Sequence, residues 1–136
     1  MQKYLTTGII FLGLTLASSA FSQNSLMSNG RYMPSGYCFG IVAISNTVVP
    51  GLAKESSIIP KEYQKPILTD KMIEDLKQKA IDQAKWEGSY NNWSSDFDNG
   101  VESIWDLVES NVNKPALPLL VNVIDKMKSC LNNIAP

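Results

Sequence analysis

The stretch that decides the fold is residues 36–49, which read GYCFGIVAISNTVV. This stretch is apolar almost throughout, and the turn signal Pro50-Gly51 closes it. Its β-branched residues favour a strand, but fourteen residues without a turn signal are long for a strand. Its large residues also keep helical spacing, at Tyr37, Ile41, Ile44 and Val48. We therefore predict a buried helix here, with a strand as the alternative.

Residues 52–68 contain two prolines and mixed charge, which indicates a connecting loop. Thr69 then stands where an N-terminal helix cap is expected, Asp70 falls in the first turn, and Gly88 marks the end. The apolar stripe of this second predicted helix is Ile73, Leu76, Ala80 and Ala84. The segment therefore predicts an amphipathic helix that packs on the first.

Residues 89–100 are polar and aromatic, and we interpret them as a loop. Asn99 is followed three residues later by Glu102, which resembles a capping box that opens a third helix. The predicted inner face of this helix is Val101, Ile104, Trp105, Val108 and Val112. Prolines at 115 and 118 suit the first turn of a fourth helix, whose stripe is Leu120, Val123, Ile124, Met127 and Leu131. The predicted fold class is all-α, a small single-domain bundle of about four helices.

The chain has only two cysteines, Cys38 near the start of the predicted first helix and Cys130 near the end of the last. Thiol-exchange proteins keep their two cysteines close in sequence, whereas these are far apart. In an oxidising compartment we expect them to form a structural disulfide.

The first 22 residues have the pattern of a cleavable secretory signal peptide. Lys3 precedes an apolar stretch, residues 8–17, that is too short for a membrane-spanning helix. Ala20 and Ser22 supply the small residues that signal peptidase requires, so we predict cleavage after Ser22. No cysteine follows the cut to carry a lipid anchor. We expect a periplasmic or secreted mature chain, residues 23–136, that forms one helical domain behind a loose leader at 23–34, in which Asn29-Gly30 is a turn signal.

Composition excludes several classes of function. The 12 basic residues less Lys3 leave 11 against 13 acidic residues in the predicted mature chain, a net charge of −2 that disfavours nucleic-acid binding. The absence of histidine removes Ser-His and Cys-His nucleophilic pairs and histidine-ligated zinc. The acidic run after Asp96 lacks the glycine and glutamate positions of a calcium loop. We predict no enzymatic activity, no metal and no cofactor.

The most unusual feature is residues 86–113, which hold six acidic residues, all three tryptophans and no basic residue. Aromatic rings surrounded by acids favour docking onto a basic protein partner, because the rings give buried contact and the acids steer the encounter. The alternative is a solvated helix face beside core tryptophans. The position of Trp105 in the predicted apolar stripe assigns this tryptophan to the core. The predicted partner-binding residues are Trp86, Tyr90, Trp93, Asp96, Phe97, Asp98 and Glu102.

Three segments resemble the Rap/Tai-type periplasmic immunity proteins that accompany type VI secretion amidase toxins. Residues 37–43 are similar to the family's cysteine-containing opening helix, and residues 58–60 with 68–72 to its Cys-Ile-Pro and the helix behind it. Residues 113–120, running into 127–130, resemble its proline-started last helix that ends in cysteine. The family's middle cysteine is replaced by an aliphatic residue, and residues 89–100 have no counterpart.

The resemblance implies a helical periplasmic protein that blocks a peptidoglycan-cleaving amidase by placing a loop in or over its cleft. The competing hypothesis is a periplasmic chaperone or envelope-assembly adaptor, which would need an exposed apolar groove. Both are non-enzymatic binding proteins without a membrane anchor.

Overall fold

The computed structural model describes residues 27–28 and 31–134. The predicted signal peptide and the turn predicted at residues 29–30 lie outside this range. The chain divides into two compact units, Met1–Met33 and Pro34–Pro136. In the first unit β1 (Met27–Ser28) pairs antiparallel with β2 (Arg31–Tyr32), so the predicted leader carries a short ladder.

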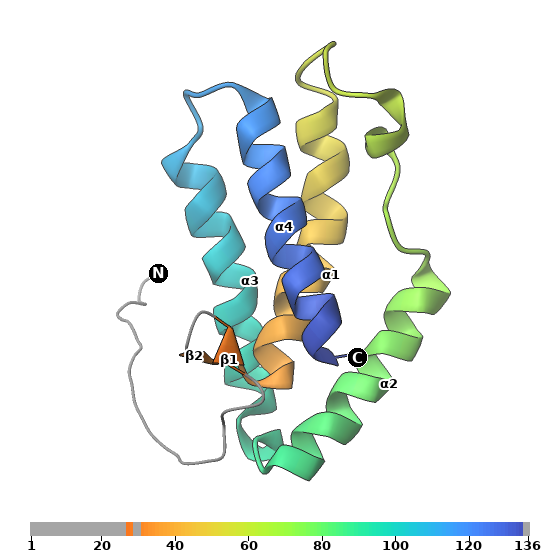
Figure 1. Cartoon of the computed structure of the whole chain (residues 1–136), viewed down its shortest axis with the longest axis vertical. Helices are drawn as coiled ribbons and strands as arrows, with labels where there is room; N and C mark the ends of the chain where they lie inside the picture. The colour runs from red at the N-terminus through yellow and green to blue at the C-terminus, as the bar shows by residue number, and fades with distance from the viewer. Residues whose placement is uncertain (1–26, 29–30, 135–136) are drawn as a thin grey trace. The chain divides into compact units, whose positions relative to one another are not determined.

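The second unit is helical, which confirms the predicted all-α class with its disulfide. Its described residues form α1 (Ser35–Ala53), α2 (Asp70–Glu87), α3 (Trp93–Ser110) and α4 (Ala116–Ile134), with the short 3-10 helices η2 (Lys61–Gln64) and η3 (Tyr90–Asn92). Figure 1 shows α1, α3 and α4 along the long axis, with α2 inclined to them. Because α1 packs against each of the other three helices, it forms the centre of the core.

The apolar stretch at 36–49 is a buried helix, and the strand alternative is wrong. Cys38, Val42 and Val49 in α1 are fully buried. The helix runs past the turn signal at Pro50 to Ala53, because Leu52 and Ala53 are also buried and hold the last turn in the core. By length and composition α1 would be able to span a membrane, but 61% of this stretch is buried within the protein, as in the core helix of a globular domain.

The backbones of α1 and α3 meet directly at glycines. A Cβ atom added at Gly40 would fall under 3.0 Å from the carbonyl oxygen of Phe97, and one at Gly100 would meet that of Tyr37 equally closely. Gly36 lies one turn before Gly40 on the same face of α1. A Cβ atom added at Gly36 would lie 3.1 Å from the carbonyl oxygen of Trp93. Only a residue without a side chain fits at Gly40 and Gly100 without displacing a backbone.

The third helix starts earlier than the sequence indicates. It begins at Trp93, so the predicted loop at 89–100 and the capping box at Asn99 and Glu102 are wrong. The physical reason is the pair Trp93 and Phe97, one turn apart, whose rings lie 5.9 Å and 5.8 Å from the ring of Phe39 in α1. This aromatic contact stabilises the first turn of α3 even though the residues between are polar.

The second helix has the bounds that the sequence indicates. The Thr69 hydroxyl accepts a hydrogen bond from the Met72 amide, and Gly88 ends the helix in the left-handed conformation with φ of 84°. The buried part of its stripe is Leu76, Ala80 and Ala84.

The disulfide joins the first turn of α1 to the last turn of α4. The Cα atoms of Cys38 and Cys130 are 4.9 Å apart, and 92 positions of sequence separate the two residues. Closing so long a loop removes roughly 4 to 5 kcal/mol of conformational entropy from the unfolded chain in the simple chain model. The cross-link therefore holds the N-terminal turn of the central helix against the end of the chain.

Two matched substitutions test the glycine contact. Gly40→Ala forces the α1 and α3 backbones apart and should lower the free energy of unfolding by about 2 kcal/mol. Gly51→Ala, in the same helix but with no atom within 4 Å of the added Cβ, should raise it by about 0.5 kcal/mol. Denaturant unfolding of both variants measures the difference, and equal effects would contradict the close crossing.

Candidate functional site

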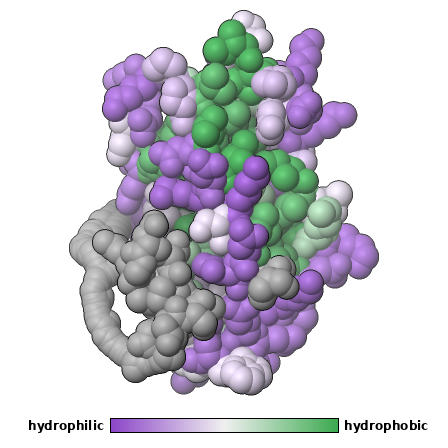
Figure 2. Space-filling model, viewed as in Figure 1, coloured by the Kyte–Doolittle hydropathy of each residue, from purple (hydrophilic) through white to green (hydrophobic). Residues whose placement is uncertain are grey.

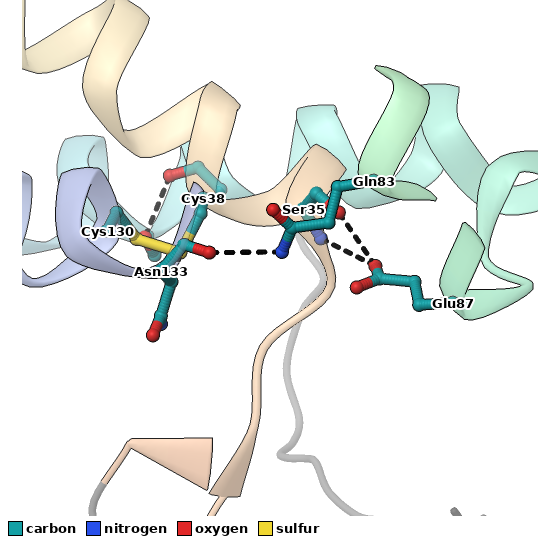
Figure 3. The surroundings of a disulfide bond; sticks show 8 residues. Ser35, Cys38, Gln83, Glu87, Cys130 and Asn133 are labelled. Atoms are coloured by element: carbon teal, nitrogen blue, oxygen red, sulfur yellow. Dashed lines mark hydrogen bonds between the residues drawn. A yellow bond between two sulfur atoms is a disulfide. The ribbon is translucent and has the colours of Figure 1, made fainter. Parts of the chain in front are cut away.

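The half-buried carboxylate of Glu87 organises the end of the domain where α1 begins. One oxygen of Glu87, the last residue of α2, accepts hydrogen bonds from the Ser35 amide at 2.9 Å and the Ser35 hydroxyl at 2.8 Å (Figure 3). The Ser89 hydroxyl donates to the same oxygen at 2.6 Å. Because Pro34 provides no side-chain cap, Glu87 takes that role and places its negative charge at the positive end of α1.

The disulfide lies about one turn along α1 from Ser35, at Cys38. The Gln83 side chain in α2 donates to the backbone oxygen of Asn133 in α4 at 3.0 Å, as Figure 3 shows. The Asn133 amide lies 3.8 Å from the sulfur of Cys38, within reach of a weak hydrogen bond. Together with Asp96 these groups form what we call the polar corner, defined by Ser35, Gln83, Glu87, Ser89, Asp96 and Asn133.

The carboxyl group of Asp96 has a raised pKa. Asp96 lies in the first turn of α3, and its Cβ is 3.1 Å from the position that a Cβ at Gly36 would occupy, so it faces the start of α1. Burial, and secondarily the negative charge of Glu87, raise the pKa of Asp96 to about 7. The second oxygen of Glu87 is buried and has no hydrogen-bond partner among the described residues. The corner therefore holds one carboxylate and one carboxyl group that is neutral below about pH 7.

A carboxyl group with a pKa near 7, such as that of Asp96, placed near a second acidic side chain is also what acid–base catalysis uses. Here one oxygen of Glu87 already accepts three hydrogen bonds from the chain's own Ser35 and Ser89. Ion networks that serve only the fold perturb pKa values in the same way. We therefore interpret Glu87 as a cap of α1, and Asp96 as a neighbouring acid whose ionisation lowers the stability of the fold.

The predicted partner-binding residues do not form one surface. Trp86 is 91% exposed at the end of α2, Tyr90 is half exposed, and Asp98 is exposed. Trp93 and Phe97 instead pack inward on Phe39, Asp96 belongs to the polar corner, and Glu102 is half-buried on α3.

Tyr90 connects the core aromatics with the surface. Its ring lies 6.5 Å from that of Trp93, and the Lys85 ammonium lies 5.0 Å from its centroid. Such a cation–π contact restricts the tyrosine on its exposed side. Since Glu87 and Ser89 fix the turn between α2 and α3, the position of Tyr90 depends on the polar corner.

The assignment of Trp105 to the core is wrong. Trp105 is 45% exposed and Val112 is 73% exposed, whereas Ile104 is fully buried. Successive residues of a helix are turned by about 100°, so burial of Ile104 turns Trp105 towards the flank. The signal that would have found this is the spacing of Trp93, Phe97, Gly100 and Ile104, which continues the stripe backwards into the presumed loop.

A second surface feature is apolar. Figure 2 shows hydrophobic residues gathered between hydrophilic borders on the face where α4 and the C-terminal half of α1 lie. In α4, Val121 is half exposed, and Leu117, Ile124 and Leu131 are only partly buried.

Among the described residues there is no group of three or more histidine, cysteine, aspartate or glutamate side chains arranged to hold a metal ion. Comparison of the chain with protein-family models, with curated proteins and with solved structures gives no match.

The raised pKa of Asp96 predicts a pH dependence of stability. Asp96 binds its proton more tightly in the folded state, with a pKa of about 7 against 3.8, so stability should fall as the pH rises from about 4 to about 7 and then level off. Asp96→Asn removes the ionising group and should raise the free energy of unfolding by about 2 kcal/mol at pH 8.

The same substitution should have little effect at pH 4, where the carboxyl group of Asp96 is already neutral in the folded state. Asp98→Asn, two residues further along α3 and exposed, is the control that should change stability little at either pH. Chemical unfolding at several pH values measures both variants. Equal stability of wild type and Asp96→Asn at pH 8 would show that Asp96 carries no such cost.

Proposed function

We propose that the protein is an exported, non-enzymatic binding protein that docks onto a basic protein partner and acts as an immunity protein against a peptidoglycan-cleaving amidase. The observation that carries the binding role is Trp86, whose side chain is 91% exposed at the end of α2. The fold gains little from a tryptophan in that position. Tryptophan is also the residue type that most often anchors protein–protein interfaces.

The charge pattern supports a basic partner. Between residues 86 and 113 there are six acidic and no basic residues, and Asp98, Asp106 and Glu109 among them are exposed. Acids around an interface mainly accelerate association with a positively charged surface, an effect that salt screens beyond about 8 Å at physiological ionic strength.

Export is supported by two features. The disulfide between Cys38 and Cys130 is compatible with an oxidising compartment, and the apolar stretch near the N-terminus is compatible with a secretion signal. The absence of histidine from the whole chain supports a binding role over a catalytic one. The choice of an amidase as the partner depends on the resemblance to the Rap/Tai-type immunity proteins.

The apolar area on α4 favours a second candidate, a periplasmic chaperone or envelope-assembly adaptor. Such a protein binds the apolar segments of unfolded or unassembled partners, and the exposed apolar edge around Val121 offers a surface of that kind.

The neighbouring reading frame supplies the probe that tests the proposal. If it encodes a secreted Cys-His amidase, that enzyme should bind this protein and lose activity. Trp86→Ala should weaken the complex about thirtyfold, corresponding to about 2 kcal/mol, and leave the melting temperature unchanged. Ile58→Ala removes another strongly exposed apolar side chain, 71% exposed and elsewhere on the surface, and should leave the affinity unchanged.

Trp93→Ala is the opposite control, because Trp93 stacks on Phe39 and its removal should lower the melting temperature. An amidase that keeps its full activity in the presence of this protein would refute the immunity role. Suppression of the aggregation of unfolded envelope proteins, lost in Val121→Lys, would establish the adaptor instead.

A further inference from the structure

The outward side of α3 carries a regular stripe that combines acids with apolar residues. Its members are spaced four and three residues apart, and they are Asp98, Glu102, Trp105, Glu109 and Val112. At about 100° per residue the four members inside the helix fall within a sector of about 60°. We call the five residues the α3 stripe. The last of them, Val112, follows two residues after the end of the helix.

Among the described residues, α3 packs mainly on α1 and makes few contacts with α4. It meets α1 through Phe97 and Gly100, and Ile104 is fully buried. In the α3 stripe, Trp105 is 45% exposed and Val112 is 73% exposed, while Asp98 and Glu109 are also exposed. Inside the helix Trp105 is the only apolar member of the stripe, and Val112 adds a second apolar side chain beyond the helix end.

The charges on and beside the α3 stripe indicate which class of partner can bind there. Asp98, Glu102 and Glu109 lie within it, Asp106 lies beside it, and no basic residue occurs between residues 86 and 113. Nucleic acids and anionic membrane surfaces are repelled by this charge. A second copy of the same stripe is also repelled, because carboxylates would face carboxylates. A helix with lysine or arginine beside its apolar face is complementary.

We propose that the α3 stripe is a docking face for a basic amphipathic helix of a partner protein. Apolar residues of that helix contact Trp105 and Val112, and its lysine or arginine side chains pair with Glu102, Glu109 and Asp98. The inference rests on the proposed binding function and adds the structural class of the segment that is bound. It is independent of the identity of the partner as an amidase.

A designed peptide tests the docking face directly. The probe is a helical peptide of about 21 residues with leucines at heptad spacing and lysines flanking them. The control peptide has the same composition in an order that gives no apolar face. Calorimetric titration into the oxidised, full-length mature chain should show micromolar binding of the first peptide only, with an affinity that falls as salt is raised from about 0.05 to 0.3 M.

Variants of the protein locate the binding. Trp105→Ala should weaken binding of the peptide at least roughly tenfold, and Glu102→Gln with Glu109→Gln should reduce both affinity and salt dependence. Trp86→Ala, at the other exposed tryptophan, should leave binding of the peptide unchanged. Equal binding of the two peptides, absence of binding, or an unchanged affinity in both the Trp105 and the glutamate variants would overturn the proposal.

The amidase experiment separates this inference from the function on which it rests. Inhibition of an amidase through Trp86, with no peptide bound at the α3 stripe, leaves the proposed function intact and rejects the docking face. Peptide binding that depends on Trp105, with no effect on an amidase, supports the docking face and rejects the immunity role.

Discussion

The backbone contact between α1 and α3 is the constraint on which the surface of this protein depends. With glycine at positions 40 and 100 the two helices approach until the backbone of one meets the backbone of the other. So close a contact leaves little freedom for α3 to rotate or slide. It brings Phe97 onto Phe39 and buries Ile104, and the same rotation directs Trp105 outward beside the acids. The exposed face of α3 therefore follows from residues that lie on its opposite side.

The polar corner fixes the second part of the surface. Glu87 caps α1 and accepts hydrogen bonds from Ser35 at the start of α1 and from Ser89 in the α2–α3 turn, while the disulfide and Asn133 hold α4 against the same end of α1. This arrangement supports the turn that carries Trp86 and Tyr90. It also has a cost, because burial beside Glu87 raises the pKa of Asp96 to about 7.

Much of the fold was predictable from the sequence, and the errors have a common physical cause. The buried helix around Cys38, the bounds of α2 and the disulfide follow from apolar composition, capping residues and cysteine number, each a local signal. The sequence does not predict the start of α3 at Trp93, because most residues of its first turns are polar. In these turns the aromatic residues that pack inward are Trp93 and Phe97. The predicted inner face from Val101 to Val112 correctly contains Ile104 but is too wide, because it also includes the exposed Trp105 and Val112. Gly100 stands at the end of the predicted loop, although in the structure it allows the backbone of α1 to pack closely on α3. No local sequence pattern reveals which helix will pack against a glycine.

The exposure of the three tryptophans reports both the rotation of α3 and the location of the proposed binding surface. The most direct measurement follows their three indole N–H signals in an NMR spectrum of the nitrogen-15-labelled protein while a soluble paramagnetic agent is added. The structure predicts that Trp86 is bleached most strongly, that Trp105 is bleached less, and that Trp93 is protected by Phe39 and Tyr90. A protected Trp105 together with a strongly bleached Trp93 would contradict the rotation of α3 and the docking face inferred from it.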